Sequence, residues 1–236
     1  MKNNRLDETT IGAAKVIVDI LPGGKVIPNT KITPKKITVH NTGNVDASAK
    51  NNHNYMKNLN KSGERICSWH FTVGYDEIYQ AQSCNYKCYH AGTSKGNNTS
   101  IAIEICMYSD KNKQALAYHN ATELIKIIMK YYGFTVNDVT THKYWSGKRC
   151  PQYLLDGKYS MTWAWFKSGL EEPKTFKVKI ICEELNIRKG AGTNHPVVGT
   201  VKKNEVFTIV ESKNGFGKLL SGAGWISINS KYVKKI

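Results

Sequence analysis

The sequence contains no run of about 18 apolar residues, the length that a membrane-spanning helix requires. Near its start, the apolar stretch from Ile11 to Leu21 is interrupted by Lys15 and Asp19. An apolar signal core followed by a small-residue cleavage site is therefore missing. We expect no membrane insertion and no secretion signal, so the chain is made in the cytoplasm and reaches any target outside it by another route.

Acidic residues are scarce, because 18 Asp and Glu stand against 34 Lys and Arg, a formal net charge of +16. The excess is densest after residue 173, where 12 basic and 4 acidic residues fall within 63 positions. Such a charge favours an anionic polymer (nucleic acid, an anionic membrane surface or a wall rich in teichoic acid), or it serves solubility alone. Patterned nucleic-acid-binding motifs are absent, so we expect no nucleic acid as a partner.

Paired cysteine motifs are also missing. The 6 cysteines include one close pair, Cys84 and Cys88, but no second pair with zinc-finger spacing accompanies it. A chain of 236 residues is long enough to build its cores without disulfides, so we expect reduced thiols. The His-Glu-x-x-His sequence of many zinc peptidases does not occur either.

Apolar periodicity over the first 168 residues predicts a mixed α/β sheet with helices on its faces. Asp46 is the candidate N-cap of the first helix, and Gly133 is expected to stop the longest one. The segment 83–99 is rich in Asn, Ser, Gly and Tyr and is expected to form a long loop. We expect strands at 36–40, 69–73, 78–80 and 101–106, and helices at 46–60, 112–132 and 157–168.

A charge-mixed segment at 169–175 is expected to be a linker. After it, short stretches of alternating apolar and polar residues predict a small all-β module over 176–236. Trp225 is expected to pack inward within one of these strands. The expected strands cover residues 185–190, 198–204, 207–210 and 224–226.

The segment 141–151 carries the strongest chemical signal. It places His142 and Cys150 eight residues apart, with Lys148 two residues before the cysteine, and His40 ends an apolar strand-like run earlier in the chain. Two imidazoles and one thiolate suit tetrahedral zinc, and three protein ligands leave one position for water, as in a catalytic site. Taken singly, each histidine is more often an ordinary core or surface residue.

Several motifs resemble the zinc-dependent N-acetylmuramoyl-L-alanine amidase family, which includes peptidoglycan recognition proteins. Within that family the sequence is most similar to phage endolysins of spore-forming Gram-positive hosts. The second part of the chain resembles the bacterial SH3-like domains that anchor lysins to cell walls, through Leu185-Asn186-Ile187-Arg188 and Gly224-Trp225-Ile226. The amidase likeness covers about residues 34–168 and rests on His40-Asn41-Thr42, Ser68-Trp69-His70-Phe71, Ser100 through Cys106, and Thr141-His142 through Cys150-Pro151.

The resemblance implies an amidase catalytic domain at 1–168, a linker at 169–175 and an SH3-like wall-binding domain at 176–236. It implies an enzyme that cleaves the amide bond between N-acetylmuramic acid and L-alanine with a zinc-activated water, which leads to bacterial lysis. The expected partners are peptidoglycan and other cell-wall polymers. We expect a monomer that is made in the host cytoplasm and acts on the wall after release.

The resemblance also implies roles for single residues. His40, His142 and Cys150 are the expected zinc ligands. Glu104 lies in an otherwise apolar strand, and such local conflicts concentrate at functional sites, although a strand residue facing solvent is the alternative. We expect Glu104 to act as general base and proton shuttle, and Lys148 to stabilise the oxyanion.

One position departs from the family. Many relatives have Tyr where this chain has Trp69, and an indole has no acidic hydroxyl, so the proton transfers fall to Glu104. We expect Trp69 to form a wall or a sugar-stacking surface. His90 resembles a family position near the cleft and is expected to bind substrate, whereas His70 is expected to pack within its strand.

Three other functions stay open at this point. The chain is a non-catalytic peptidoglycan-binding protein if it has kept the fold and lost the metal, but Cys150 argues against this because that thiol is usually the residue lost. It is a host autolysin for wall turnover or germination if it is encoded by a bacterium. A different zinc hydrolase is the third alternative, and the second domain has another partner if it is not a wall binder.

Overall fold

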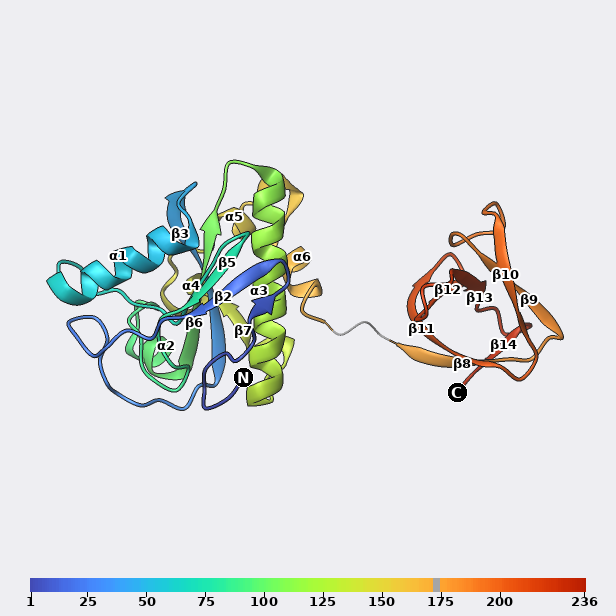
Figure 1. Ribbon diagram of the computed structural model, residues 1–236, viewed down its shortest axis with the longest axis horizontal. Helices are drawn as coiled ribbons and strands as arrows, with labels where there is room; N and C mark the ends of the chain where they lie inside the picture. Colours follow the sequence, from blue (N-terminus) through green and yellow to red (C-terminus); the bar gives the residue numbers. More distant parts are fainter. Residues whose placement is uncertain (172–174) are drawn as a thin grey trace. The chain divides into compact units, whose positions relative to one another are not determined.

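The computed structural model describes residues 1–171 and 175–236, and the chain divides into two compact units between Glu171 and Glu172 (Figure 1). Residues 172–174, the centre of the predicted linker, lie outside the described residues. No described helix combines the length and the apolar character that crossing a bilayer requires. None of the 6 cysteines, all of which are described, is paired in a disulfide.

A mixed seven-stranded sheet forms the centre of the first unit, in the order β1-β2-β5-β4-β6-β3-β7. The parallel strands β4, β6, β3 and β7 make up one half, and β5 joins this half through an antiparallel pairing with β4. The predicted mixed α/β fold is therefore confirmed. The strands are β1 (Thr10–Ile11), β2 (Ala14–Val18), β3 (Lys36–Val45), β4 (Phe71–Val73), β5 (Glu77–Gln80), β6 (Ser100–Met107) and β7 (Val139–Thr141).

Two helices cover the sheet, α1 (Ala49–Ser62) and α3 (Lys111–Tyr132), and Figure 1 shows the strands between them. The predicted helix at 112–132 and its stop are confirmed, because Gly133 takes the left-handed conformation (φ 70°) that ends the helix. The apolar face of α3 packs on the odd-numbered residues of β6, whereas α1 packs against Trp69 and Ala102 on the other side. Alternation along β6 thus assigns its two faces to two cores.

The structure corrects several predicted boundaries. The strand predicted to end at His40 continues to Val45. Ser48, not Asp46, caps α1 by accepting the backbone N–H of Asn51, while the Asp46 carboxylate accepts the N–H of Ser109. A helix was not predicted within 83–99, which contains α2 (Ser94–Thr99).

The helix predicted at 157–168 is shorter than expected. It is α6 (Trp163–Ser168), and the 3-10 turn η2 (Lys158–Ser160) precedes it, because Tyr159 (φ 60°) takes a non-helical conformation. Strands β1, β2 and β7 and three short helical elements were not predicted. These elements are η1 (Val136–Asp138), α4 (His142–Ser146) and α5 (Gln152–Leu155).

The second unit is a sheet of seven antiparallel strands, in the order β10-β9-β13-β12-β11-β8-β14, which agrees with the predicted small all-β module. Its core is formed by apolar side chains, including Ile226. Trp225 precedes Ile226 on β13 and is only half-buried, so its predicted inward packing is wrong. The strands are β8 (Phe176–Ile180), β9 (Glu184–Arg188), β10 (Val197–Lys202), β11 (Val206–Lys213), β12 (Phe216–Leu219), β13 (Trp225–Ser227) and β14 (Val233–Lys235).

Candidate metal centre and active site

The two central strands of the first unit place His40 and Glu104 side by side. The two residues are direct partners in the parallel pairing of β3 with β6. Because side chains alternate along a strand, both point away from the apolar core that holds their neighbours Val39 and Ile103. The otherwise apolar strands β3 and β6 therefore direct His40 and Glu104 to the face of the sheet that lies opposite the large apolar core.

The chain brings His142 to the same place through the neighbouring strand. β7 lies beside β3, with Thr141 paired to Val39, and the hydroxyl of Thr141 caps α4 by accepting the backbone N–H of Tyr144. His142 is the first residue of that helix. The backbone carbonyl of Cys150 then accepts the N–H of Lys143, which folds the following loop back toward the histidine.

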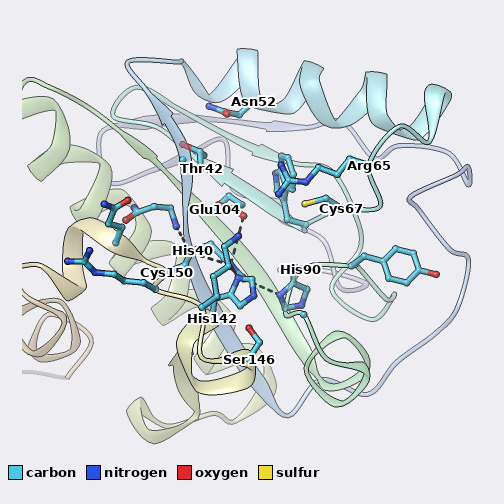
Figure 2. Close-up of a pocket in the computed structure, with 18 of the residues that line it drawn as sticks. His40, Thr42, Asn52, Arg65, Cys67, His90, Glu104, His142, Ser146 and Cys150 are labelled. Carbon is cyan, nitrogen blue, oxygen red and sulfur yellow. Dashed lines mark hydrogen bonds and ion pairs between the residues drawn. The ribbon is translucent and has the colours of Figure 1, made fainter.

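His40, His142 and Cys150 converge as predicted, and all three are buried (Figure 2). The Nδ1 atoms of the two histidines are 3.1 Å apart, and the Cys150 Sγ atom is 3.8 Å from the Nδ1 atom of His40. Among residues 1–171 and 175–236, these are the only three His, Cys, Asp or Glu side chains that converge in this way.

The three side chains fit a tetrahedral metal centre. Ligands to zinc lie about 2.0 Å (nitrogen) and about 2.3 Å (sulfur) from the ion, so tetrahedral angles separate two nitrogens by about 3.3 Å and a nitrogen from a sulfur by about 3.6 Å. The observed separations of 3.1 and 3.8 Å are close to both values. Two facing imidazole lone pairs repel each other unless a cation or a proton lies between them.

Burial keeps the two imidazoles neutral. It lowers the pKa of His40 well below its ordinary value and that of His142 to about 4, and nearby cationic groups act in the same direction. Burial raises the pKa of the Cys150 thiol to about 12, although the backbone N–H of Asn41, 3.4 Å from the sulfur, opposes this. The thiolate form therefore needs a cation beside it, as metal coordination supplies.

Glu104 does not face solvent as an ordinary strand residue does. Its side chain is 13% exposed, and its Oε1 atom is 3.9 Å from the Nδ1 atom of His40. The Oε2 atom is buried and has no hydrogen-bond partner among the described residues. Burial raises the pKa of Glu104 to about 8, and the positive charges of Lys148 and Arg65 pull it down. A carboxyl that titrates near neutral pH suits a general acid or base.

Lys148 lies at the exposed rim of the same cleft. Its positive charge lowers the pKa of His40, His142, Cys150 and Glu104. One cation therefore acts on every group of the candidate centre, which is the position that stabilisation of a developing negative charge requires.

Trp69 and His90 also line this cleft, but both are nearly buried, with 5% and 6% exposure. The indole N–H of Trp69 donates to the Thr72 hydroxyl at 2.7 Å, which holds the ring in the wall and favours a wall over a stacking surface. The Nδ1 atom of His90 is 3.0 Å from the Nε2 atom of His40, so His90 stands behind a candidate ligand. His70 packs within the sheet as expected, since its ring nitrogens pair with the backbone of Tyr86 and Ala102.

Among the cleft residues that were not predicted, three carry polar or charged groups close to the candidate centre. The Asn41 backbone N–H points at the Cys150 sulfur, and its side chain bonds the backbone of Tyr153 and Ile105. The Thr42 hydroxyl is buried beside the cleft without a hydrogen-bond partner among the described residues. Arg65 lies on the loop after α1, where no periodicity points to it. Asn41 and Thr42 had a signal, because they follow His40 directly in an apolar run.

The cleft has a volume of about 740 Å³, which is in the range of small-molecule sites. Tyr55, Tyr89 and Ile66 contribute to its lining together with the residues described above. Three of its lining side chains are basic, namely Arg65, Lys148 and Arg149, whereas Glu104 is its one acidic member. The cleft is therefore suited to a substrate that carries negative charge.

Two segments of the chain match known protein families. Residues 30–153 match the family described as N-acetylmuramoyl-L-alanine amidase, and residues 183–234 match the bacterial SH3 domain. The N-acetylmuramoyl-L-alanine amidase XlyA of Bacillus subtilis is 43% identical over 160 residues, which are 66% of this chain and 50% of XlyA. The amidase CwlH of the same organism is 40% identical over 153 residues, which are 63% of this chain and 57% of CwlH.

Solved structures resemble about two thirds of the chain. The catalytic domain of XlyA shares 42% identity with a TM-score of 0.59, over 67% of this chain and 100% of that domain. PlyL shares 30% identity with a TM-score of 0.57, over 67% of this chain and 96% of the PlyL chain. The present chain matches about half the length of the curated relatives XlyA and CwlH.

Proposed function

Because the chain belongs to the N-acetylmuramoyl-L-alanine amidase family, we propose that it hydrolyses peptidoglycan at the amide bond between N-acetylmuramic acid and L-alanine. The observation that carries this proposal is the convergence of His40, His142 and Cys150 beside a Glu104 oxygen that has no hydrogen-bond partner in the described part of the chain. A cleft of this chemistry would hold a metal, a base and a cation around one point. The domain assignment that goes with it is a catalytic domain at 1–168 and a wall-binding domain at 176–236.

His40, His142 and Cys150 would hold a zinc ion, which when bound polarises the scissile carbonyl and lowers the pKa of a water molecule toward about 7. Glu104 takes a proton from the attacking water through its free Oε2 atom. It then delivers that proton to the alanine nitrogen, so that a C–O bond replaces the C–N bond and a free amine leaves. The raised pKa of Glu104 suits both halves of this transfer.

Other cleft residues act on charge and position. Lys148 stabilises the negative charge that develops on the carbonyl oxygen, because it is the cation that reaches every member of the centre. The free Thr42 hydroxyl offers a hydrogen bond to the bound substrate. Arg65 and Arg149 at the cleft attract the carboxylates of the peptide stem.

For the second unit we propose capture of the cell wall. Its support is the match to the bacterial SH3 domain and the concentration of basic residues in this part of the chain. Such a unit keeps the catalytic domain near an insoluble polymer and raises the effective substrate concentration. An endolysin that causes lysis and a host autolysin both fit this arrangement.

The products of digestion test the proposed reaction. Purified peptidoglycan is incubated with the full chain, and the soluble fragments are identified by mass spectrometry. An amidase releases stem peptides that begin with free L-alanine and leaves the glycan strands intact. New reducing ends without free alanine would identify a glycosidase instead, and undigested walls would favour a non-catalytic binding protein. The variant Cys150→Ser serves as the inactive control.

A further inference from the structure

His90 links a candidate metal ligand to a buried network of hydroxyl groups. On one side, its Nδ1 atom is 3.0 Å from the Nε2 atom of His40. On the other side, its Nε2 atom is 3.3 Å from the backbone oxygen of Ser100 and 3.4 Å from the Ser100 hydroxyl. Figure 2 shows His90 beside His40 on the side away from Cys150. The side chain of His90 is thus enclosed by protein and joined to the proposed zinc site.

The direction of each hydrogen bond in this network follows from its far end. The indole nitrogen of Trp145 can only donate, and it donates to the Thr38 hydroxyl at 2.8 Å. The Ser100 hydroxyl donates to the Gly96 carbonyl, which can only accept, also at 2.8 Å. The remaining bond therefore runs from the Thr38 hydroxyl to the Ser100 oxygen at 2.8 Å.

Ser100 consequently presents only acceptors to His90. Its hydroxyl proton is engaged by Gly96, and its backbone oxygen never donates. The Nε2 atom of His90 must carry a proton to bond either oxygen. The buried His90 ring has no carboxylate among its hydrogen-bond partners in the described part of the chain, so the neutral ring carries its one proton on Nε2 and its Nδ1 atom is a bare acceptor.

The protonation state of His90 determines that of His40. Facing a bare Nδ1 atom of His90, the Nε2 atom of His40 carries the proton and donates it. The Nδ1 atom of His40 is then left with its lone pair, and this is the atom that faces His142 and Cys150. A neutral imidazole has only one such lone pair, so the network decides which side of His40 is able to bind a metal.

We propose that His90 is a positioning residue that holds His40 in the tautomer protonated on Nε2, so that its Nδ1 atom is offered to the zinc ion. This inference rests on the zinc site of the proposed function. It replaces contact with substrate as the role of His90. Outer hydrogen-bond partners of metal-bound histidines typically change metal affinity by about 10- to 100-fold when they are mutated.

The long loop before β6 is built to deliver His90. The side-chain oxygen of Asn97 accepts the backbone N–H groups of His90 and Ala91, at 2.9 and 2.7 Å. A side chain at Gly96 would not fit, because its Cβ atom would lie 2.4 Å from that of Ala91 and 2.9 Å from the Trp145 ring. A segment without regular periodicity is thus fixed by its own polar groups, which explains how a loop residue reaches the centre.

The test compares two substitutions of His90 in the full chain. His90→Leu fills the space but removes the acceptor, whereas the side-chain oxygen of His90→Asn occupies roughly the place of Nδ1. The zinc dissociation constant is measured by competition with a chromophoric chelator. We expect zinc to bind about 10- to 100-fold more weakly to His90→Leu and within about 3-fold of wild type to His90→Asn. The matched control is His53→Leu, which removes another buried histidine that bonds Asp19 and leaves zinc affinity unchanged.

Steady-state kinetics at saturating zinc provide the second readout. A positioning role leaves the KM for soluble muropeptide within about 2-fold of wild type, whereas a raised KM with unchanged zinc affinity overturns the proposal in favour of substrate contact. Equal zinc affinity in wild type and His90→Leu also overturns it. If His90→Leu does not fold, Thr38→Val, which removes the hydroxyl that orients Ser100, takes its place with a smaller loss of affinity. If the wild-type chain itself binds no zinc, the proposed function fails before this inference is reached.

Discussion

Among the described residues, every buried polar or charged side chain belongs to the first unit, whereas the buried residues of the second unit are apolar or Gly217. The first unit buries four histidines that bond to one another or to the backbone around the candidate site, and the largely buried Glu104 lies next to them. The second unit carries its charge on the surface around a core of eight apolar side chains.

This difference in where polar and charged groups lie indicates a different role for each unit. A buried polar group costs free energy unless it is hydrogen-bonded. The oxygens of Glu104 and Thr42 in the cleft have no partner within residues 1–171 and 175–236, so they mark a place where the fold keeps groups free for a ligand. Exposed charges are screened and individually weak, but their sum attracts an oppositely charged polymer. We therefore assign selective chemistry to the first unit and general capture to the second.

Of the changes considered, removal of the Cys150 thiol should lower the activity of the first unit most. Cys150→Ser should lose zinc and lower lytic activity by about 1,000-fold or more, because a hydroxyl is a poor replacement for a thiolate ligand. Turbidity loss of host walls and metal analysis of the purified variant measure both effects. Cys182→Ser in the second unit is the matched control and should keep full activity. Wall binding by Cys150→Ser should equal that of wild type, and a parallel loss of binding would break the separation of roles.

Glu104→Gln should lower turnover by about 100-fold, the scale of general base catalysis, while zinc content and fold stay the same. The amide of Gln has the size of the carboxyl but cannot accept the proton. Release of free L-alanine amines from soluble muropeptides measures the rate. The control is Glu123→Gln, at a half-exposed partner of Lys126 on α3, and this change should be neutral. Near-normal turnover of Glu104→Gln would move the base to another residue.

Acid should destabilise the first unit through His70. Burial lowers the pKa of His70 to about 4 in the folded protein, below about 6.5 in the unfolded chain. Its contribution to stability is therefore present above pH 6.5 and is lost as the pH falls toward 4. Between pH 7 and 5 the loss is about 2 kcal/mol. Calorimetry of the full chain at these two pH values measures it.

The His70→Gln variant tests whether His70 causes this loss. Its unfolding temperature should depend less on pH than that of the wild-type chain. The exposed His195→Gln in the second unit is the control and should leave the pH dependence as it is. A wild-type pH dependence that His70→Gln does not reduce would show that other groups control the acid response. The buried His53 acts in the same direction as His70, since burial lowers its pKa as well.

Salt should have the smallest effect, and it should act on the second unit. A labelled fragment of residues 176–236 should bind host walls without the catalytic domain, and binding should weaken several-fold between about 0.05 and 0.5 M salt as charges are screened. Sedimentation with purified walls measures this. Binding that ignores salt would point to a specific pocket for the peptide stem. Absence of binding at both concentrations would make the unit structural.

The sequence was sufficient to predict those parts of the fold and site that depend on periodicity. The helical period of α3 predicted its extent, and an acidic residue within the apolar run of β6 singled out Glu104. Strand β1 was missed because it is only two residues long, and β2 was missed because it is stabilised by pairing with distant β5. The two-part division of the chain was predicted from charge and composition. Both are sums over many residues and so do not depend on single contacts.

Other parts depend on contacts that no local pattern encodes. The place of His90 behind His40 follows from Asn97 and Ser100, which fix a loop without regular alternation. Trp225 was placed inward because large aromatic residues usually pack, but Ile226 takes the core position and alternation leaves Trp225 half-buried. Ser48 replaced Asp46 as the helix cap because both residue types cap well and the turn at Asp46 (φ 63°) decides between them.

We expect His40, His142 and Cys150 to bind one zinc ion at the catalytic centre. Zinc-edge X-ray absorption on the purified full chain measures the ligands of that ion. The spectrum should show two nitrogen ligands at about 2.0 Å and one sulfur ligand at about 2.3 Å, with an oxygen completing the shell. The sulfur contribution should disappear in Cys150→Ser. A zinc ion without sulfur in the wild-type spectrum, or an unchanged spectrum in the variant, would show that these three residues do not form the zinc site.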